Sequence, residues 1–128
     1  ELIQMRKITI RRLYHDKLST KMNRYLADIL FENLITNSIK HNLTPGFMSI
    51  SIDSEKIQIS NSGEIPKVNP DKLFDRFTKG NQKSKSLGLG LPIIKAICDT
   101  YLLPVRYTFE TGIHDISVAF PNGRSVEL

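Results

Sequence analysis

The stretch from Phe31 to Asn42 constrains the fold more than any other part of the chain. Apolar residues recur at helical spacing within it and just upstream, which predicts a helix packed into a core. On that helix Asn33, Asn37 and Lys40 fall within roughly 60° of arc, at about 100° per residue. Apolar side chains share this face. The apolar positions of the segment are Leu26, Ile29, Leu30, Leu34, Ile35 and Ile39.

Two amides and an ammonium within an apolar stripe allow two interpretations. A buried amide without hydrogen-bond partners costs free energy, so this face either bonds other groups of the chain or meets a polar ligand. In the first interpretation the Asn side chains cap or cross-link neighbouring loops of a core helix. In the second, Asn oxygens coordinate a hard cation such as Mg²⁺, and Lys40 pairs with phosphate.

Size and composition are those of an ordinary globular chain. A length of 128 residues suits one domain spanning residues 1–128, and 40% hydrophobic with 24% charged residues is typical of a folded protein. No apolar run approaches the roughly 18 residues of a membrane span, and no signal-peptide pattern opens the chain. The single cysteine, Cys98, lies in an apolar helical pattern, so we expect it to be buried and the compartment to be reducing.

The net charge of +5 suggests an anionic partner, but only weakly. Lys and Arg are scattered, apart from Arg11-Arg12 and residues 79–85. Aromatic residues do not interleave with basic ones as they do on surfaces that bind single-stranded nucleic acid. We therefore expect no nucleic-acid partner.

Local patterns predict the remaining elements. Residues 16–23 are polar and should form a turn with a brief second strand, and residues 61–66 have the composition of a further turn. The strands should pair into a mixed sheet. In chain order we expect a strand at 8–14, a helix at 24–41, a hairpin of strands at 47–53 and 56–60, a helix at 93–101, and strands at 105–109 and 116–120 joined across Thr111-Gly112.

Regular periodicity is lost between Lys67 and Gly90, and a loop of that length is usually functional. At its end, Gly88-Leu89-Gly90 opens a helix, an arrangement in which backbone amides and the helix dipole favour an anion. It is neither a Walker loop nor a dinucleotide fingerprint, because no Gly-Lys-Ser/Thr follows and the third glycine is absent. Alone, this motif is weak.

Four blocks in order are more specific. They are Asn33…Asn37, then Asn61-Ser62-Gly63, then Phe74…Phe77, then Gly88-Leu89-Gly90-Leu91. Together they resemble the N, G1, F and G2 boxes of the sensor histidine kinase ATP-binding domain, which belongs to the larger group that includes gyrase, Hsp90 and MutL. The resemblance covers nearly the whole chain, from about Ile8 to Phe120.

The resemblance implies an α+β fold. A two-layer α/β sandwich is expected, with a mixed, mostly antiparallel sheet of about five strands covered on one face by helices. It also implies that ATP and Mg²⁺ bind between the helices and a flexible lid.

The resemblance also implies roles for residues of the first helix and the lid. Asn37 corresponds to the Mg²⁺ ligand, Asn33 supports the metal–phosphate site, and Lys40 contacts phosphate. His41 takes the position of an aromatic ring beside the nucleoside, and Phe77 anchors the lid. Lys79 reaches the terminal phosphates, so that Asn37, Lys40 and Lys79 form the expected catalytic set. The residues expected to hold the triphosphate with backbone amides are Gly88, Leu89, Gly90 and Leu91.

The G1 block departs from the family pattern. The usual sequence is Asp-x-Gly-x-Gly, whereas Asn61, Gly63 and Ile65 occupy the three defined positions here. The side-chain oxygen of Asn61 can still accept the hydrogen bond from the adenine amino group, but a neutral group accepts less strongly than a carboxylate. We expect ATP binding to persist in weakened form, and a degenerate domain without phosphotransfer is the alternative.

The implied reaction is phosphoryl transfer from ATP·Mg²⁺ to a histidine on a separate dimerisation domain, which then passes the group to a response regulator. Residues 1–7 would be the tail of that domain's helix, and this chain alone should be monomeric and cytoplasmic, as the intracellular part of a membrane-bound sensor. His15 and His114 do not fit the acceptor motif, since His15 ends a strand and His114 should be a surface residue in a hairpin turn.

Two further members of the same group remain alternatives, a serine kinase of the anti-sigma type and an ATPase. ATPases of the group place a water-activating Glu where this chain has Asn33. Glu32 lies one residue off that face and is expected to be a solvated charge.

Overall fold

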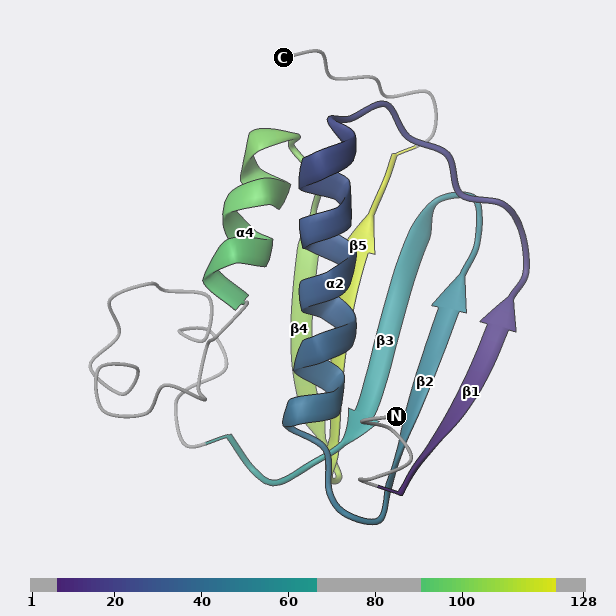
Figure 1. Ribbon diagram of the computed structural model, residues 1–128, viewed down its shortest axis with the longest axis vertical. Helices are drawn as coiled ribbons and strands as arrows, with labels where there is room; N and C mark the ends of the chain where they lie inside the picture. The colour runs from purple at the N-terminus through teal and green to yellow at the C-terminus, as the bar shows by residue number, and fades with distance from the viewer. Residues whose placement is uncertain (1–6, 67–90, 122–128) are drawn as a thin grey trace.

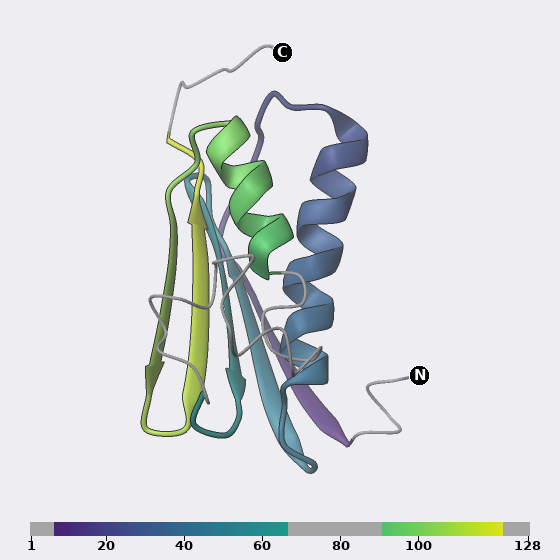
Figure 2. The same ribbon diagram turned by 90° about the vertical axis from the view of Figure 1, so that its left-hand side faces the viewer.

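The computed structural model describes residues 7–66 and 91–121. Two helices cover one face of a five-stranded sheet with strand order β1-β2-β3-β5-β4, as Figures 1 and 2 show. β1 runs parallel to β2, and the other neighbouring strands are antiparallel. The expected mixed sheet and two-layer α+β sandwich are confirmed. The elements are β1 (Ile8–Tyr14), α2 (Arg24–Lys40), β2 (Gly46–Ile52), β3 (Lys56–Ser62), α4 (Leu91–Thr100), β4 (Val105–Glu110) and β5 (Ile113–Ala119).

Helix α2 begins and ends at capping residues. The side-chain oxygen of Asn23 accepts a hydrogen bond from the backbone N–H of Leu26 at 3.1 Å, which satisfies one of the free donors of the first turn. The backbone N–H of Asn23 also donates to the hydroxyl of Tyr101 at 2.8 Å. This bond ties the start of α2 to the chain just after α4. At the other end, the N–H of His41 donates to the carbonyl of Asn37 at 3.1 Å.

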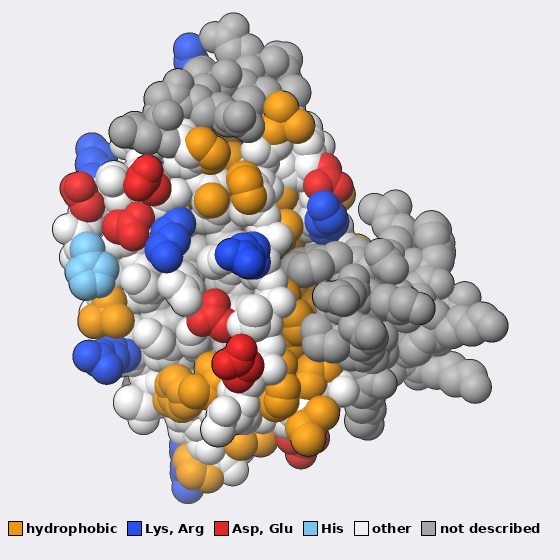
Figure 3. Space-filling view, turned by 180° about the vertical axis from the view of Figure 1, so that it is seen from behind, with side chains coloured by type: hydrophobic (Ala, Val, Ile, Leu, Met, Phe, Trp, Pro, Cys, Tyr) orange, Lys and Arg blue, Asp and Glu red, His pale blue; other side chains and the backbone are white. Residues whose placement is uncertain are grey.

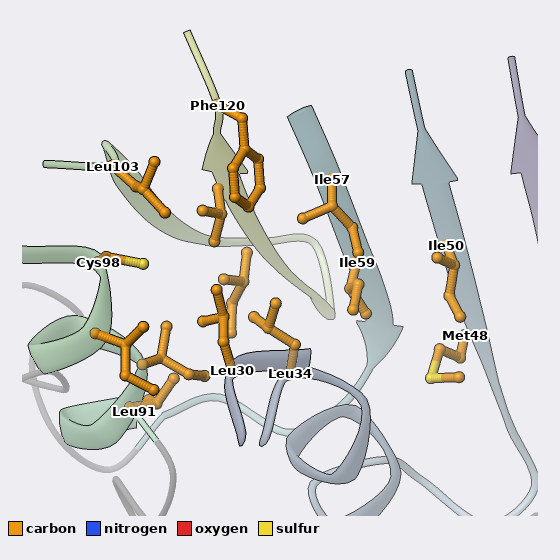
Figure 4. Packing of buried hydrophobic residues seen from close by; sticks show 14 of the residues in the cluster. Leu30, Leu34, Met48, Ile50, Ile57, Ile59, Leu91, Cys98, Leu103 and Phe120 are labelled. Atoms are coloured by element: carbon orange, nitrogen blue, oxygen red, sulfur yellow. The ribbon is translucent and has the colours of Figure 1, made fainter. Parts of the chain in front are cut away.

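The core lies between the helices and the inner face of the sheet (Figure 4). Leu30 and Leu34 are 0% and 1% exposed and lie one turn apart on α2. On β3, Ile57 and Ile59 point inward with their strand's alternation. Burying each such side chain contributes about 1.5–3 kcal/mol. The packing of these side chains sets the distance between α2 and the sheet.

Cys98 is fully buried in α4, as the sequence predicted. Burial raises the pKa of its thiol to about 12. The group therefore stays protonated near neutral pH and acts as a small apolar side chain.

Some sequence-based expectations for individual elements are wrong. Residues 15–23 contain no strand. Ile35, expected in the core, is 38% exposed because it lies about 100° further round α2 than Leu34. β3 extends to Ser62, so Asn61 and Ser62 are strand residues rather than part of a turn. β5 begins at Ile113, three residues before the predicted start at Ile116.

Two tight turns connect the antiparallel strands. The carboxylate of Asp53 accepts backbone N–H bonds from Glu55 at 2.8 Å and Lys56 at 2.9 Å, which lowers its pKa and closes the β2–β3 hairpin. Thr111 and Gly112 both have positive φ, 51° and 78°, as a two-residue hairpin with the right strand twist requires. The carbonyl of Gly112 accepts a hydrogen bond from Gly63, which joins this hairpin to the chain after β3.

Neither of the two described helices covers the outer face of the sheet. Acidic and basic side chains are interspersed there, with apolar side chains between them (Figure 3). At its centre, the carboxylate of Asp115 accepts hydrogen bonds from Ser60 at 2.7 Å and Gln58 at 2.8 Å. Of the helices in the described ranges, none is long and apolar enough to cross a membrane.

Candidate functional site

Most of the described candidate residues gather at one end of the sandwich. The last turns of α2, the end of β3 and the β4–β5 hairpin lie at the lower end in Figures 1 and 2, and α4 begins higher up, beside α2. The strand register places Asn61 opposite Met48 of β2 and His114 of β5. The inner face of the sheet and the end of α2 therefore border the same region.

Asn37 carries the most informative atom of this region. Among the described residues, its Oδ1 is the one buried side-chain polar atom without a hydrogen-bond partner. An unpaired buried carbonyl costs about 1–3 kcal/mol. An amide oxygen is also a suitable ligand for a hard cation such as Mg²⁺. The residue predicted to bind the metal thus has an oxygen that the described part of the protein leaves unsatisfied.

Asn33 lies one turn earlier and is half-buried. Its side-chain nitrogen donates to the carbonyl of Ile29 at 2.7 Å. This bond uses a donor of the amide, so Oδ1 is the atom with which Asn33 can accept a bond from a ligand or from water on a metal.

Lys40 and His41 close the helix. Lys40 is exposed and is the last residue of α2, where the helix dipole favours a positive charge. His41 is half-buried and forms the C-cap. Both follow Asn37 within about one turn, so a phosphate near Asn37 would be within the reach of a lysine side chain.

Asn61 is 2% exposed and faces inward from β3. Its side-chain nitrogen donates to the carbonyl of Ser62 at 2.8 Å. This bond fixes the orientation of the Asn61 amide, and its Oδ1 remains as the acceptor. An adenine amino group would need such an acceptor, which is the role that the resemblance implies for this position.

Gly63 lies two residues after Asn61, and no larger residue fits there. A Cβ at this position would lie 2.4 Å from Cδ2 and 2.6 Å from Nε2 of His114. It would also lie 2.9 Å from the carbonyl oxygen of His41. A Cβ atom does not make non-bonded contacts that short, so the glycine lets the backbone approach the end of α2 closely. Ile65, at the position of the missing second glycine, is 77% exposed.

A buried polar cluster beside the site was not predicted. Asn42 is 6% exposed, and its side-chain nitrogen donates to the carbonyl of Phe47 at 2.8 Å. The hydroxyl of Ser62 donates to Asn42 Oδ1 at 2.6 Å and accepts from the N–H of Phe47 at 3.0 Å. These bonds form a closed ring that fixes the loop after α2 to the end of β3. The sequence signal is the polar pair Asn42 and Ser62, whose residue types are equally typical of a helix stop and a turn.

His114 is a half-buried strand residue, so the prediction of a surface residue in a turn is wrong. Its Nε2 lies 2.8 Å from the carbonyl oxygen of Glu64, and its Nδ1 lies 2.5 Å from the hydroxyl of Tyr107. Burial lowers the pKa of the ring, and the hydrogen bond to Glu64 partly opposes that shift. The ring also stacks on Tyr107 and packs against Phe109.

Leu91 begins α4, and its side chain is buried in the core at 4% exposure. Any contribution from Leu91 to an anion site would therefore come from its backbone N–H, as predicted. The other predicted residues of the lid and glycine motif lie outside the described residues. They are Phe77, Lys79, Gly88, Leu89 and Gly90.

The described residues hold no cluster of three or more His, Cys, Asp or Glu side chains that could bind a metal by themselves. Among the described residues, a cation in this region would be bound by amide oxygens, with further oxygens from the ligand itself. Mg²⁺ bound with a nucleoside triphosphate fits this donor set, because Mg²⁺ usually takes few ligands from the protein and several oxygen ligands from phosphate and water.

Comparison with known protein families agrees with this geometry. The profile of the histidine kinase-, DNA gyrase B- and HSP90-like ATPases matches residues 24–122, from the start of α2 to beyond β5. The chain belongs to this family. The match includes Asn33, Asn37, Asn61 and Gly63.

Curated relatives include staphylococcal proteins named heme sensor protein HssS. The protein of Staphylococcus saprophyticus is 32% identical over 92 residues, which cover 67% of this chain and 20% of that protein. That of Staphylococcus epidermidis is 34% identical over 79 residues, covering 59% and 18%. This ATPase-family chain thus spans about a fifth of the length of these relatives.

Solved histidine kinase domains share the fold. The catalytic domain of histidine kinase ThkA, in a nucleotide-free form, superimposes with a TM-score of 0.77 at 21% identity and covers 93% of this chain and 82% of that one. The mycobacterial sensor histidine kinase MprB gives a TM-score of 0.70 at 18% identity, covering 94% and 88%. The chain therefore belongs to the histidine kinase-, DNA gyrase B- and HSP90-like ATPase family and has the fold of histidine kinase catalytic domains.

Proposed function

We propose that this domain binds ATP·Mg²⁺ and supplies the γ-phosphoryl group to a histidine on a dimerisation domain of the same protein. The phosphohistidine then serves a response regulator. The observation that carries the proposal is the buried, unpaired Oδ1 of Asn37, at the position to which the resemblance assigns the Mg²⁺ ligand. A cation bound with the nucleotide would satisfy that atom and neutralise phosphate charge.

The chain's own residues would bind and orient the nucleotide rather than form covalent bonds with it. Asn37 Oδ1 would be the protein ligand of Mg²⁺, with Asn33 beside it and Lys40 directed to phosphate. Asn61 would accept the hydrogen bond of the adenine amino group from the inner face of β3. Lys79, Phe77 and the amides of residues 88–91 are proposed for the terminal phosphates and the lid. Such positioning supplies most of the catalysis in phosphoryl transfer.

The described residues favour neither an ATPase nor a degenerate module without phosphotransfer. Glu32 is exposed on α2, as expected for a solvated charge, so among the described residues of α2 no carboxylate takes the place of Asn33 as a water-activating base. A degenerate module would no longer need an unsatisfied oxygen at Asn37, since an apolar residue there would avoid its cost. We also propose a cytoplasmic location, where ATP is available, and a monomeric state for this part of the protein.

The test uses the full-length protein that contains this chain. Incubation with γ-labelled ATP and Mg²⁺ should give a phosphoprotein whose label is lost in acid and stable in base, as a phosphohistidine requires. Asn37→Ala in the same protein should give no label, whereas Ile35→Ala, an exposed change on the same helix, should label normally. Labelling of serine, or phosphate release without a phosphoprotein, would replace this proposal with one of the alternatives.

A further inference from the structure

Three segments meet at the ring of His114. The residue lies on β5, Tyr107 lies on the neighbouring strand β4, and Glu64 lies two residues past the end of β3. The ring joins the last two through its two nitrogens, Nδ1 to the hydroxyl of Tyr107 and Nε2 to the carbonyl of Glu64. No motif of the sequence pointed to this connection.

The chemistry of the partners fixes the direction of both bonds. The carbonyl of Glu64 can only accept, so Nε2 of His114 must carry the proton. In the neutral ring Nδ1 is then an acceptor, and the hydroxyl of Tyr107 donates to it. Burial raises the pKa of that hydroxyl to about 12, so it keeps its proton. Tyr107 therefore selects the tautomer with which His114 can hold Glu64.

The ring is also held on its faces and edge. Its centroid lies 4.6 Å from that of Phe109 and 5.8 Å from that of Tyr107, and the rings of His114 and Tyr107 are stacked at 23°. Its edge occupies the space that a side chain at position 63 would need. His114 thus contacts Gly63 and binds Glu64, which both lie between Asn61 and Ile65.

We propose that His114 is a positioning residue of the nucleotide site, oriented by Tyr107, that holds the backbone of Gly63 and Glu64 as a fixed edge for the purine. The proposal rests on the proposed function, since the purine is that of the bound nucleotide. It gives a reason why this chain can have Ile65 in place of the second glycine of the block. The hydrogen bond to Glu64 sets the course of the backbone, and the Ile65 side chain is directed to solvent.

Two substitutions of His114 distinguish the effect of its hydrogen bond to Glu64 from the effect of its ring packing. His114→Ala removes both ring and donor, and loss of the hydrogen bond should weaken ADP binding about fivefold to tenfold. His114→Gln keeps an amide N–H at nearly the distance of Nε2 from the backbone, so its ADP affinity should stay within about twofold of wild type. Calorimetry with ADP·Mg²⁺ on the 128-residue chain measures both.

The tyrosines supply a matched control. Tyr107→Phe and Tyr101→Phe each remove one hydroxyl with a hydrogen bond, but Tyr101 bonds Asn23 at the opposite end of the sandwich. Tyr107→Phe should weaken ADP binding about threefold, because the ring of His114 loses its fixed tautomer. Tyr101→Phe should lower stability and leave ADP affinity unchanged.

Measurements on the nucleotide-free protein test the role of His114 separately from the proposed function. Nitrogen NMR of the imidazole should show the Nε2–H tautomer. Exchange of the Gly63 amide proton, which is hydrogen-bonded to the carbonyl of Gly112, should accelerate about tenfold in His114→Ala but not in His114→Gln. If the wild type bound no nucleotide while these results held, the proposed function would fail and the anchoring would stand. A Nδ1–H tautomer, wild-type ADP affinity in His114→Ala, or equal losses of affinity and melting temperature in the Ala and Gln variants would overturn the inference.

Discussion

Two asparagines near the end of α2 should respond to alanine substitution in opposite ways. Asn37 has a buried oxygen without a partner among the described residues, whereas both ends of the Asn42 amide are bonded. If Asn37 serves a ligand and Asn42 serves the fold, Asn37→Ala should abolish the effect of Mg²⁺ on nucleotide affinity and leave the fold intact. Asn42→Ala should do the reverse.

The magnitudes follow from the bonds. Removing the unpaired oxygen of Asn37 relieves a cost of about 1–3 kcal/mol, which offsets the van der Waals packing that the rest of the side chain provides. The free energy of unfolding of Asn37→Ala should therefore lie within about 1 kcal/mol of wild type, or above it. Asn42→Ala removes hydrogen bonds to Phe47 and Ser62 at about 1 kcal/mol each, so stability should fall by about 2 kcal/mol.

Urea unfolding gives the stabilities, and calorimetry with ADP, with and without Mg²⁺, gives the affinities. Under conditions in which Asn42→Ala is fully folded, its Mg²⁺-dependent affinity should equal that of the wild type. The reasoning would be refuted if Asn37→Ala were destabilised by about 2 kcal/mol or more and still bound ADP in a Mg²⁺-dependent way. Asn37 would then be a structural residue of the helix.

Three other changes should have specific effects. Asn61→Asp should tighten adenine recognition, because a carboxylate accepts the amino-group hydrogen bond more strongly, and an unchanged ratio of ATP to GTP affinity would remove Asn61 from the purine site. Leu34→Ala should lower stability by about 2–5 kcal/mol and Ile35→Ala by less than about 1 kcal/mol, since only the first is buried; similar decreases in urea unfolding would contradict the packing described. Burial holds the pKa of His114 below its ordinary value of 6.5, so the unfolded chain binds the proton more readily. Stability should therefore fall as the pH drops below about 6.5 and stay constant above it, and His114→Gln should remove this part of the slope in urea midpoints measured across that range.

The sequence predicted the scaffold well because its signals are local. The apolar spacing around Leu30 and Leu34 set the helix, and the alternation of Ile50, Ile57 and Ile59 set the inner face of the hairpin. Family resemblance then supplied the arrangement of the sheet, which periodicity alone could not give. The prediction for Ile35 failed because the buried face of α2 is narrower than the arc over which its apolar residues are spread.

The polar contacts around the site could not be predicted in the same way. Asn42 and Ser62 are 20 positions apart, and His114 and Glu64 are 50 apart. They meet only because of the strand register and the course of the chain after β3. Polar residues at strand ends also resemble turn residues in composition, which is why Asn61 and His114 were expected in turns. The roles of the triphosphate and lid residues between positions 67 and 90 stay predictions, because they lie outside the described residues.

The central claim is that this chain binds an adenine nucleotide together with Mg²⁺ through the end of α2. Calorimetric titration of the chain with ATP and ADP, each with and without Mg²⁺, and with GTP as the comparison, tests it most directly. We predict binding in the micromolar range that strengthens with Mg²⁺ and favours adenine over guanine. The absence of binding at millimolar nucleotide, or affinity indifferent to Mg²⁺, would contradict the account and leave the domain a scaffold with an altered purine site at Asn61.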